Sequence, residues 1–180
     1  SGRCWLFTGL NVLRSKMINE QKLNGMEFSQ NYLFFYDQLE KANLFLQAII
    51  DTRKKPMDDQ TVVWLFHNPL SDGGTFTGVA DLIAKYGVVP KGVMPETYGS
   101  NNTSSFTSYI KRKLREDALA LRADSKAKPA QLEALKQKQL SEIYHMLTLV
   151  LGEPVTEFTW APKDSKGKYL SEPKKYTPQS

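Results

Sequence analysis

Along most of the chain, apolar residues recur at intervals of three and four positions, the spacing that places them on one face of an α-helix. The first helix is expected to begin near Trp5 and to end at Gly25, because glycine commonly ends a helix. One apolar stripe runs along it, formed by Leu6, Leu10, Leu13 and Met17.

A second, longer helix is expected after Ser29, whose hydroxyl can cap the first free N–H groups of a helix. Its apolar face is wide, which predicts that the helix is deeply buried. The pattern closes at the basic run that precedes Pro56. The residues on this face are Leu33, Phe34, Phe35, Tyr36, Leu39, Phe45, Leu46 and Ile49.

The next apolar run, 61–66, supports two interpretations. Its β-branched residues favour a strand, whereas Asp58 and Asp59 just before it favour a helix start. Residue propensity alone leaves both open.

A glycine-containing loop, 68–74, follows this run, and the paired Gly73 and Gly74 permit backbone geometries that other residues resist. A short helix is expected from about Thr75 to Gly87, and Val88–Pro90 is expected to be extended. The stretch 95–105 is interpreted as a polar loop.

Two more helices are expected in the second half of the chain. The first carries Ile110, Leu114 and Leu121, and the second runs from Pro129 to Gly152. A strand is expected near 157–160, and the Lys-, Pro- and Ser-rich stretch 161–180 has little to bury.

Composition fits one globular domain or a large piece of one. The chain has 180 residues, of which 41% are hydrophobic and 24% charged, and no apolar run is long enough to span a membrane. Its formal charge of +5 and its basic clusters at 53–55 and 111–115 permit contact with phosphates. However, the basic residues are interspersed with acidic ones, which disfavours nucleic-acid binding.

Cys4 is the candidate for chemistry, since the first turn of a helix favours a reactive thiolate. As the only cysteine it forms no intrachain disulfide, which favours a reducing compartment. Free cysteine is also often just a small buried apolar residue. Adjacent carboxylates at 58–59 and 116–117 point in different directions on a helix, so we expect no metal site.

Residues 1–5, Ser-Gly-Arg-Cys-Trp, resemble the nucleophile motif of papain-like cysteine peptidases. Ser1 and Arg3 depart from the general motif, and both departures resemble the bleomycin hydrolase and aminopeptidase C branch, where Gly-Arg-Cys-Trp is typical. Further segments resemble that branch in the same order: Phe28–Phe35, Ser71–Gly74, Lys85–Lys91, Met94–Tyr98 and Glu157–Trp160.

The resemblance implies an α+β papain-like fold, of which this chain is the mainly helical half. Residues 1–105 would be that half, with the nucleophile helix and the glycine loop; 106–152 would be a helical insertion, and 153–180 a strand-containing start and polar tail. The β-rich half would be absent or lie beyond Ser180.

The same resemblance assigns roles to site residues. Cys4 would be the nucleophile, Gly73 and Gly74 would bind the peptide backbone, and Phe76 would lie near the pocket for the substrate's second residue. The cysteine pair that staples this loop in family papains is replaced here by Ser1 and Ser71. Without a ligand, the two glycines would simply form a helix-entry turn.

The catalytic partners of Cys4 are missing from the sequence. Papain-like catalysis needs a histidine, an asparagine and an upstream glutamine, and no asparagine follows Asn102. His145 has the expected spacing from Cys4 but lies in a helical pattern, and His67 precedes the glycine loop. We interpret both as surface or structural histidines, so this chain alone is expected to be inactive.

The resemblance therefore predicts a thiol-dependent peptidase that removes amino-terminal residues from peptides, without a cofactor. It also implies a cytoplasmic location and a hexamer of the full-length protein. One alternative is a non-catalytic helical interaction module derived from a peptidase, for which nucleic acid at the basic patches is one candidate partner. Another is a redox-active thiol protein. The redox alternative lacks a resolving cysteine in this chain.

Overall fold

Helices make up most of the chain. The computed structural model describes residues 2–21, 26–164 and 166–180, so Ser1 and the expected helix end at Gly25 lie outside the described residues. Within the described residues, no helix is both long and apolar enough to cross a lipid bilayer. The elements are α1 (Cys4–Gln21), α2 (Gln30–Asp51), α3 (Gln60–His67), α4 (Phe76–Tyr86), α5 (Tyr98–Asn101), α6 (Thr103–Ala123), α7 (Pro129–Leu151), β1 (Phe158–Trp160) and β2 (Lys174–Tyr176).

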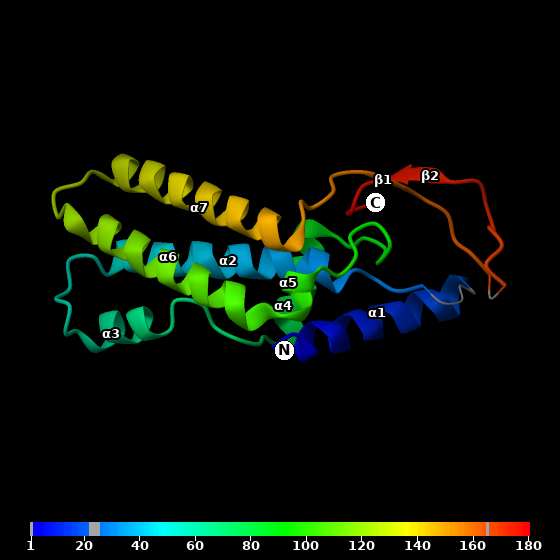
Figure 1. Ribbon diagram of the computed structural model, residues 1–180, viewed down its shortest axis with the longest axis horizontal. Coiled ribbons are helices and arrows are strands. Elements are labelled where there is room, and N and C mark those ends of the chain that lie inside the picture. Colours follow the sequence, from blue (N-terminus) through cyan, green and yellow to red (C-terminus); the bar gives the residue numbers. More distant parts are fainter. Residues whose placement is uncertain (1, 22–25, 165) are drawn as a thin grey trace.

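Helix α2 is the central element of the fold. Its start is capped as predicted, because the Ser29 hydroxyl accepts a hydrogen bond from the Tyr32 N–H at 3.0 Å. It contacts α1, α3, α4, α6 and α7, and α6 and α7 run alongside it (Figure 1). The predicted deep burial of this helix is confirmed, since apolar side chains on several of its sides are buried.

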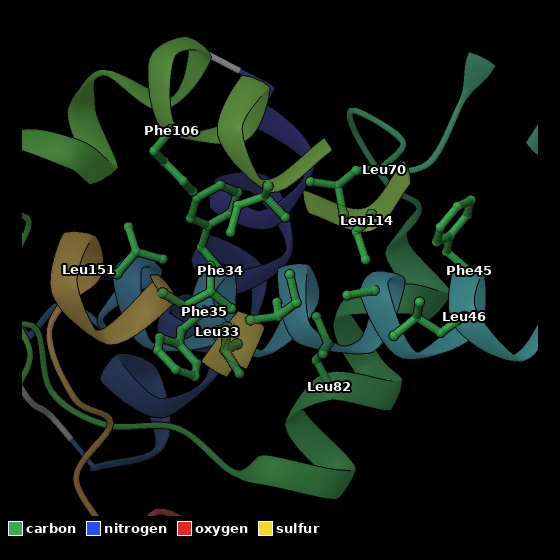
Figure 2. Close-up of a cluster of buried hydrophobic side chains, with 14 of the residues drawn as sticks. Leu33, Phe34, Phe35, Phe45, Leu46, Leu70, Leu82, Phe106, Leu114 and Leu151 are labelled. Carbon is green, nitrogen blue, oxygen red and sulfur yellow. The ribbon is translucent and has the colours of Figure 1, made fainter. Parts of the chain in front are cut away.

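The core forms where the other helices bring apolar side chains against α2. Phe34 of α2 meets Phe106 of α6 edge to face, with ring centroids 6.2 Å apart. Leu82 of α4 and Leu151 of α7 approach α2 from other directions (Figure 2). Because one helix contributes to each of these contacts, α2 ties the helical layers into a single core.

Local capping signals set the ends of three helices. The segment 61–66 is part of a helix, α3, because the Asp59 carboxylate accepts hydrogen bonds from the Thr61 and Val62 N–H groups and caps its start. Helix α4 ends at Gly87, with φ +74°, and α7 ends at Gly152, with φ +86°, as the sequence predicts.

The predicted polar loop at 95–105 is wrong in part. Residues 98–101 form α5, and α6 begins at Thr103 rather than near 106. Thr97 and Ser100 form a reciprocal capping box, with hydrogen bonds of 3.0 and 2.8 Å between each hydroxyl and the other residue's N–H. Short hydroxyl residues favour loops and helix caps equally, so composition alone could not separate the two outcomes.

A two-stranded antiparallel sheet follows the last helix. The predicted strand is confirmed as β1, whereas β2 lies in the stretch expected to have little to bury. Phe158 pairs with Tyr176, and their rings stack 6.0 Å apart. Beyond β2, the Pro178 carbonyl accepts a hydrogen bond from the Val88 N–H at 2.8 Å, which brings the tail back to the end of α4.

Two leucines of α2 provide a matched test of the core. Leu46 is fully buried and Leu44 is 71% exposed. We expect Leu46→Ala to lower the free energy of unfolding by about 3–4 kcal/mol, because it opens a cavity next to α2, and Leu44→Ala to change it by less than about 0.5 kcal/mol. Urea denaturation followed by circular dichroism measures both, and equal losses would contradict the central position of α2.

Candidate active site

Cys4 is the first residue of α1, as the sequence predicts, and its side chain is exposed to solvent. The helix begins there because the Arg3 carbonyl already accepts a hydrogen bond from the Phe7 N–H, at 3.1 Å. The unpaired N–H groups of a first helical turn carry partial positive charge and are not used by the helix itself. The position therefore suits a nucleophile that must meet a ligand from solvent.

Arg3, directly before Cys4, is buried and forms an ion pair with Glu96. Its Nη1 lies 2.8 and 3.1 Å from the two carboxylate oxygens, and its guanidinium stacks over the Phe34 ring with 5.4 Å to the centroid. Because Arg3 is buried, its charge would be costly to leave without the Glu96 carboxylate, which is itself partly exposed. The contacts of Arg3 with Glu96 and Phe34 thereby fix the backbone turn that leads into Cys4.

The segment Met94–Ser100, which carries Glu96, is itself anchored, and we call it the junction segment. Ser100 donates a hydrogen bond to the Glu96 carboxylate at 2.5 Å. Asn31 of α2 donates to the carbonyls of Pro95 and Leu151, at 2.9 and 2.7 Å. The junction segment therefore joins the turn before Cys4 to the start of α2 and the end of α7.

The sequence analysis did not predict the Arg3–Glu96 pair, although both residues lie in segments that it singled out. Arg3 stood out as a departure from the general papain motif, and Glu96 lies in a segment that resembles the same branch. A charged residue next to a nucleophile, in a stretch that becomes buried, needs a counterion. That requirement was the signal available, but the partners are 93 positions apart, so the sequence does not show which acid supplies the counterion.

The glycine loop packs directly against the residues that flank Cys4. A Cβ atom on Gly74 would lie 2.7 Å from the Trp5 ring, and one on Gly2 would lie 1.5 Å from the Asp72 carboxylate. The Trp5 ring is held in place by a hydrogen bond from Nε1 to the Gly2 carbonyl, at 2.9 Å. Gly74 is thus required for this close approach, whereas the Asp72 carboxylate near Gly2 is the exposed end of a flexible side chain. The loop forms a wall beside Trp5, the neighbour of Cys4.

Gly73 and Phe76 lie on either side of Gly74, and we call the loop surface formed by Gly73 and Gly74 the glycine wall. Gly73 has a φ of +80°, a backbone conformation that strongly favours glycine. Phe76 is the first residue of α4 and is 62% exposed, so its ring faces solvent at the end of the loop. The structure thus places Gly74 against Trp5, the residue after Cys4, and the expected roles of Gly73, Gly74 and Phe76 in substrate binding stay predictions.

A hollow of about 380 Å³, which we call the polar hollow for its hydroxyl and carboxylate groups, is lined by residues of the loop and of α6. Gly2 and Asp72 line it together with Thr103 and Thr107 of α6. The buried Gln38 also lines it, and the Oε1 atom of Gln38 has no hydrogen-bond partner among the described residues. The hollow therefore has room and polar groups for part of a ligand beside the turn that contains Cys4.

Neither histidine is placed to act as a base for Cys4. His67 ends α3, and its Nδ1 lies 2.9 Å from the Val63 carbonyl. His145 lies on the exposed side of α7. Within the described ranges, no hydrogen bond joins either ring to Cys4.

The basic clusters are used within the fold. Lys113 pairs with Asp117 and Glu142 at 2.5 and 2.6 Å. Arg115 donates to the Phe66 carbonyl at 2.8 Å. In the part of the chain that the structure describes, no group of three metal-binding side chains gathers either. Among the described residues, these charged groups therefore offer no candidate site that competes with Cys4.

An exposed cysteine at a helix start, beside a glycine wall in a mainly helical half-fold, is the arrangement of a papain-like cysteine peptidase. The family comparison agrees over the whole chain: residues 1–180 match the model of the Peptidase C1-like family, and the chain belongs to that family. The aminopeptidase C of Listeria monocytogenes is 42% identical over 170 residues, which cover 93% of this chain and 38% of that protein. Human bleomycin hydrolase is 37% identical over 173 residues, which cover 94% of this chain and 38% of that protein.

A solved structure gives the same answer for the fold. The crystal structure of PepW from Lactobacillus rhamnosis superposes with a TM-score of 0.93 at 41% identity, covering 99% of this chain and 40% of that one. The chain has the papain-like fold of this branch and corresponds to its mainly helical amino-terminal half. It spans about two fifths of the length of the relatives it matches.

The Arg3–Glu96 pair can be tested with a charge-removing variant. We expect Glu96→Gln to lower the free energy of unfolding by about 3 kcal/mol, because it leaves the Arg3 guanidinium buried without a counterion. The control is Glu27→Gln, since the Glu27–Lys91 pair is about half exposed, and its loss should cost less than about 1 kcal/mol. Similar losses for the two variants in urea denaturation would mean that burial adds nothing to the Arg3 pair.

Gly74 offers a second test, of close packing at the site. We expect Gly74→Ala to destabilise the protein by about 1–3 kcal/mol, because the new methyl group overlaps the Trp5 ring. A Cβ atom on Gly92 meets nothing within 4 Å, so Gly92→Ala should change stability by less than about 0.5 kcal/mol. Thermal unfolding compares the two, and a Gly74→Ala variant as stable as Gly92→Ala would show that the ring has room to move.

Proposed function

We propose that the complete protein is a cysteine aminopeptidase in which Cys4 is the nucleophile. The observation that carries this proposal is the exposed Cys4 at the first turn of α1, with the glycine loop packed against the neighbouring Trp5. Relatives that carry the names aminopeptidase C and bleomycin hydrolase match nearly the whole chain and support the same activity.

In this proposal, the Cys4 thiolate attacks the scissile carbonyl carbon of a peptide, and a C–S bond forms while the C–N bond breaks. The leaving amine takes a proton from a histidine, and water then hydrolyses the thioester to release the acid and the thiol. The His67 ring contacts the Val63 carbonyl and His145 lies on the exposed side of α7, so the histidine and its orienting asparagine would come from the part of the protein outside this chain.

The substrate would lie along the glycine wall in an extended conformation. Backbone groups of Gly73 and Gly74 would bond its main chain, which binds peptides of many sequences. The polar hollow beside Gly2 would receive a side chain of the substrate. Removal of amino-terminal residues, rather than internal cleavage, is proposed from the names of the relatives. The expected hexamer and cytoplasmic location stay predictions.

Substitution of the nucleophile and of both histidines in the complete protein tests this function. We expect Cys4→Ser to reduce hydrolysis of an aminoacyl-coumarin substrate by at least about a thousandfold, since a serine there lacks an adapted base. His67→Ala and His145→Ala should each retain activity within about threefold. A large loss in His145→Ala would contradict the proposed source of the base, and an active Cys4→Ser variant would exclude Cys4 as the nucleophile.

The 180-residue chain alone provides the complementary measurement. We expect it to give no turnover of the same substrate, because it lacks a base for Cys4. Turnover at the rate of the complete protein would show that no essential group is missing. A complete protein without turnover would favour the interaction module instead.

A further inference from the structure

Lys41 of α2 makes three contacts that converge on the glycine wall. Its ammonium donates hydrogen bonds to the Gly73 carbonyl at 2.7 Å and to the Asp37 carboxylate at 2.9 Å. It also lies over the Trp5 ring, 5.4 Å from the centroid. Only 18% of the Lys41 side chain is exposed, so this lysine is largely withdrawn from solvent, unlike most lysines.

Asp37 keeps this buried lysine in place. Its side chain is 8% exposed, and it also accepts a hydrogen bond from Gln38 at 3.0 Å. Burial raises the pKa of the Asp37 carboxyl, while the Lys41 ammonium acts to lower it. A buried ion pair contributes little net stability, so its effect on the free energy of folding does not explain why Lys41 lies here. Its position is explained better by what the lysine holds.

The contact with the Gly73 carbonyl fixes the direction of the next N–H group. Gly73 and Gly74 are joined by a trans peptide bond, in which the carbonyl and the N–H point in opposite directions. Because the Gly73 carbonyl is turned toward Lys41, the Gly74 N–H is turned away from α2. Among the described residues this N–H has no hydrogen-bond partner, and it is therefore free to bond a ligand.

The Gly73–Gly74 peptide would otherwise be free to rotate. Gly73 has nothing within 4 Å of the position a Cβ would take, so no packing restricts it on that side. Trp5 packs against Gly74 but makes no hydrogen bond to the loop, since its Nε1 donates to Gly2. The hydrogen bond from Lys41 is thus the polar contact that selects one orientation of this peptide.

We propose that Lys41 is a positioning residue, which holds the Gly73–Gly74 peptide so that the Gly74 N–H donates to a backbone carbonyl of the substrate. The proposal rests on the peptidase function proposed above and adds to it the side chain that orients the binding wall. Lys41 itself touches neither the substrate nor Cys4 in this role. Its loss should therefore weaken peptide binding and leave the reactivity of the thiol intact.

The test uses the complete protein and two reagents for Cys4. Iodoacetamide alkylates the thiol without using the wall, whereas an epoxysuccinyl peptide must also bind its backbone there. The measured quantity is the ratio of the two second-order rate constants, epoxysuccinyl peptide over iodoacetamide. We expect Lys41→Met, which keeps the stem over Trp5 but removes the donor, to lower this ratio about five- to tenfold, the value of one hydrogen bond. With a peptide substrate, KM should rise by a similar factor while kcat stays within about twofold.

Two further variants separate positioning from stability. Lys41→Met leaves Asp37 buried and unpaired, so the double variant Lys41→Met/Asp37→Asn removes that charge while the Gly73 carbonyl still lacks its donor. Asp37→Asn alone keeps the donor, and the amide oxygen of the asparagine can still accept the hydrogen bond that holds Lys41 in place. We expect a low ratio in the double variant and a ratio within about twofold of wild type in Asp37→Asn.

Lys85→Met is the matched control. Lys85 also pairs with a carboxylate and lies over an aromatic ring, 5.3 Å from the Tyr86 centroid, but it does not contact the loop. Its loss should leave the ratio unchanged. A wild-type ratio in Lys41→Met or in the double variant would overturn the positioning role. Failure of the proposed function looks different, because the wild-type protein would then hydrolyse no peptide.

Discussion

The ion pair between the buried Arg3 and the partly exposed Glu96 is the contact on which the arrangement of the site depends. It ties the turn before the nucleophile to the junction segment, which is bonded in turn to α2 and to the end of α7. Cys4 can therefore be exposed and still have a fixed backbone position, because the preceding residue, Arg3, is held by Glu96. The Arg in Gly-Arg-Cys-Trp is explained by this geometry: a small residue at that position would leave Glu96 without its cation.

Local signals in the sequence were sufficient to predict much of the fold. The Ser29 cap, the Gly87 and Gly152 stops and the three-and-four spacing of leucines all act within a few residues, and each is where the sequence predicts it. Cys4 belongs to this group as well, since its place at a helix start follows from the pattern just after it. The same local signals were ambiguous at 61–66, where Asp59 outweighed the β-branched residues.

The remaining features depend on residues far apart in the sequence. β2 forms because Tyr176 can stack on Phe158, and nothing within the tail itself shows that partner. Lys41 and Gly73 are 32 positions apart, and the lysine lies in a helix whose sequence predicts burial of its apolar face only. The roles of these residues follow from tertiary packing, and a single sequence contains no local signal for it. The family resemblance supplied the glycine loop, but it did not supply the contacts that hold the loop.

Four residues of α2, Phe34, Asp37, Gln38 and Lys41, are separated by the intervals that place them along one side of a helix. Phe34 lies under the Arg3 guanidinium and Lys41 bonds the Gly73 carbonyl, so this one side supports both the nucleophile turn and the glycine wall. Phe34 and Lys41 are seven residues apart, which is about two turns and about 10 Å along the axis. The distance between the support for the nucleophile turn and the support for the glycine wall is thus set by the pitch of a buried helix. The exposed loop does not have to maintain this distance.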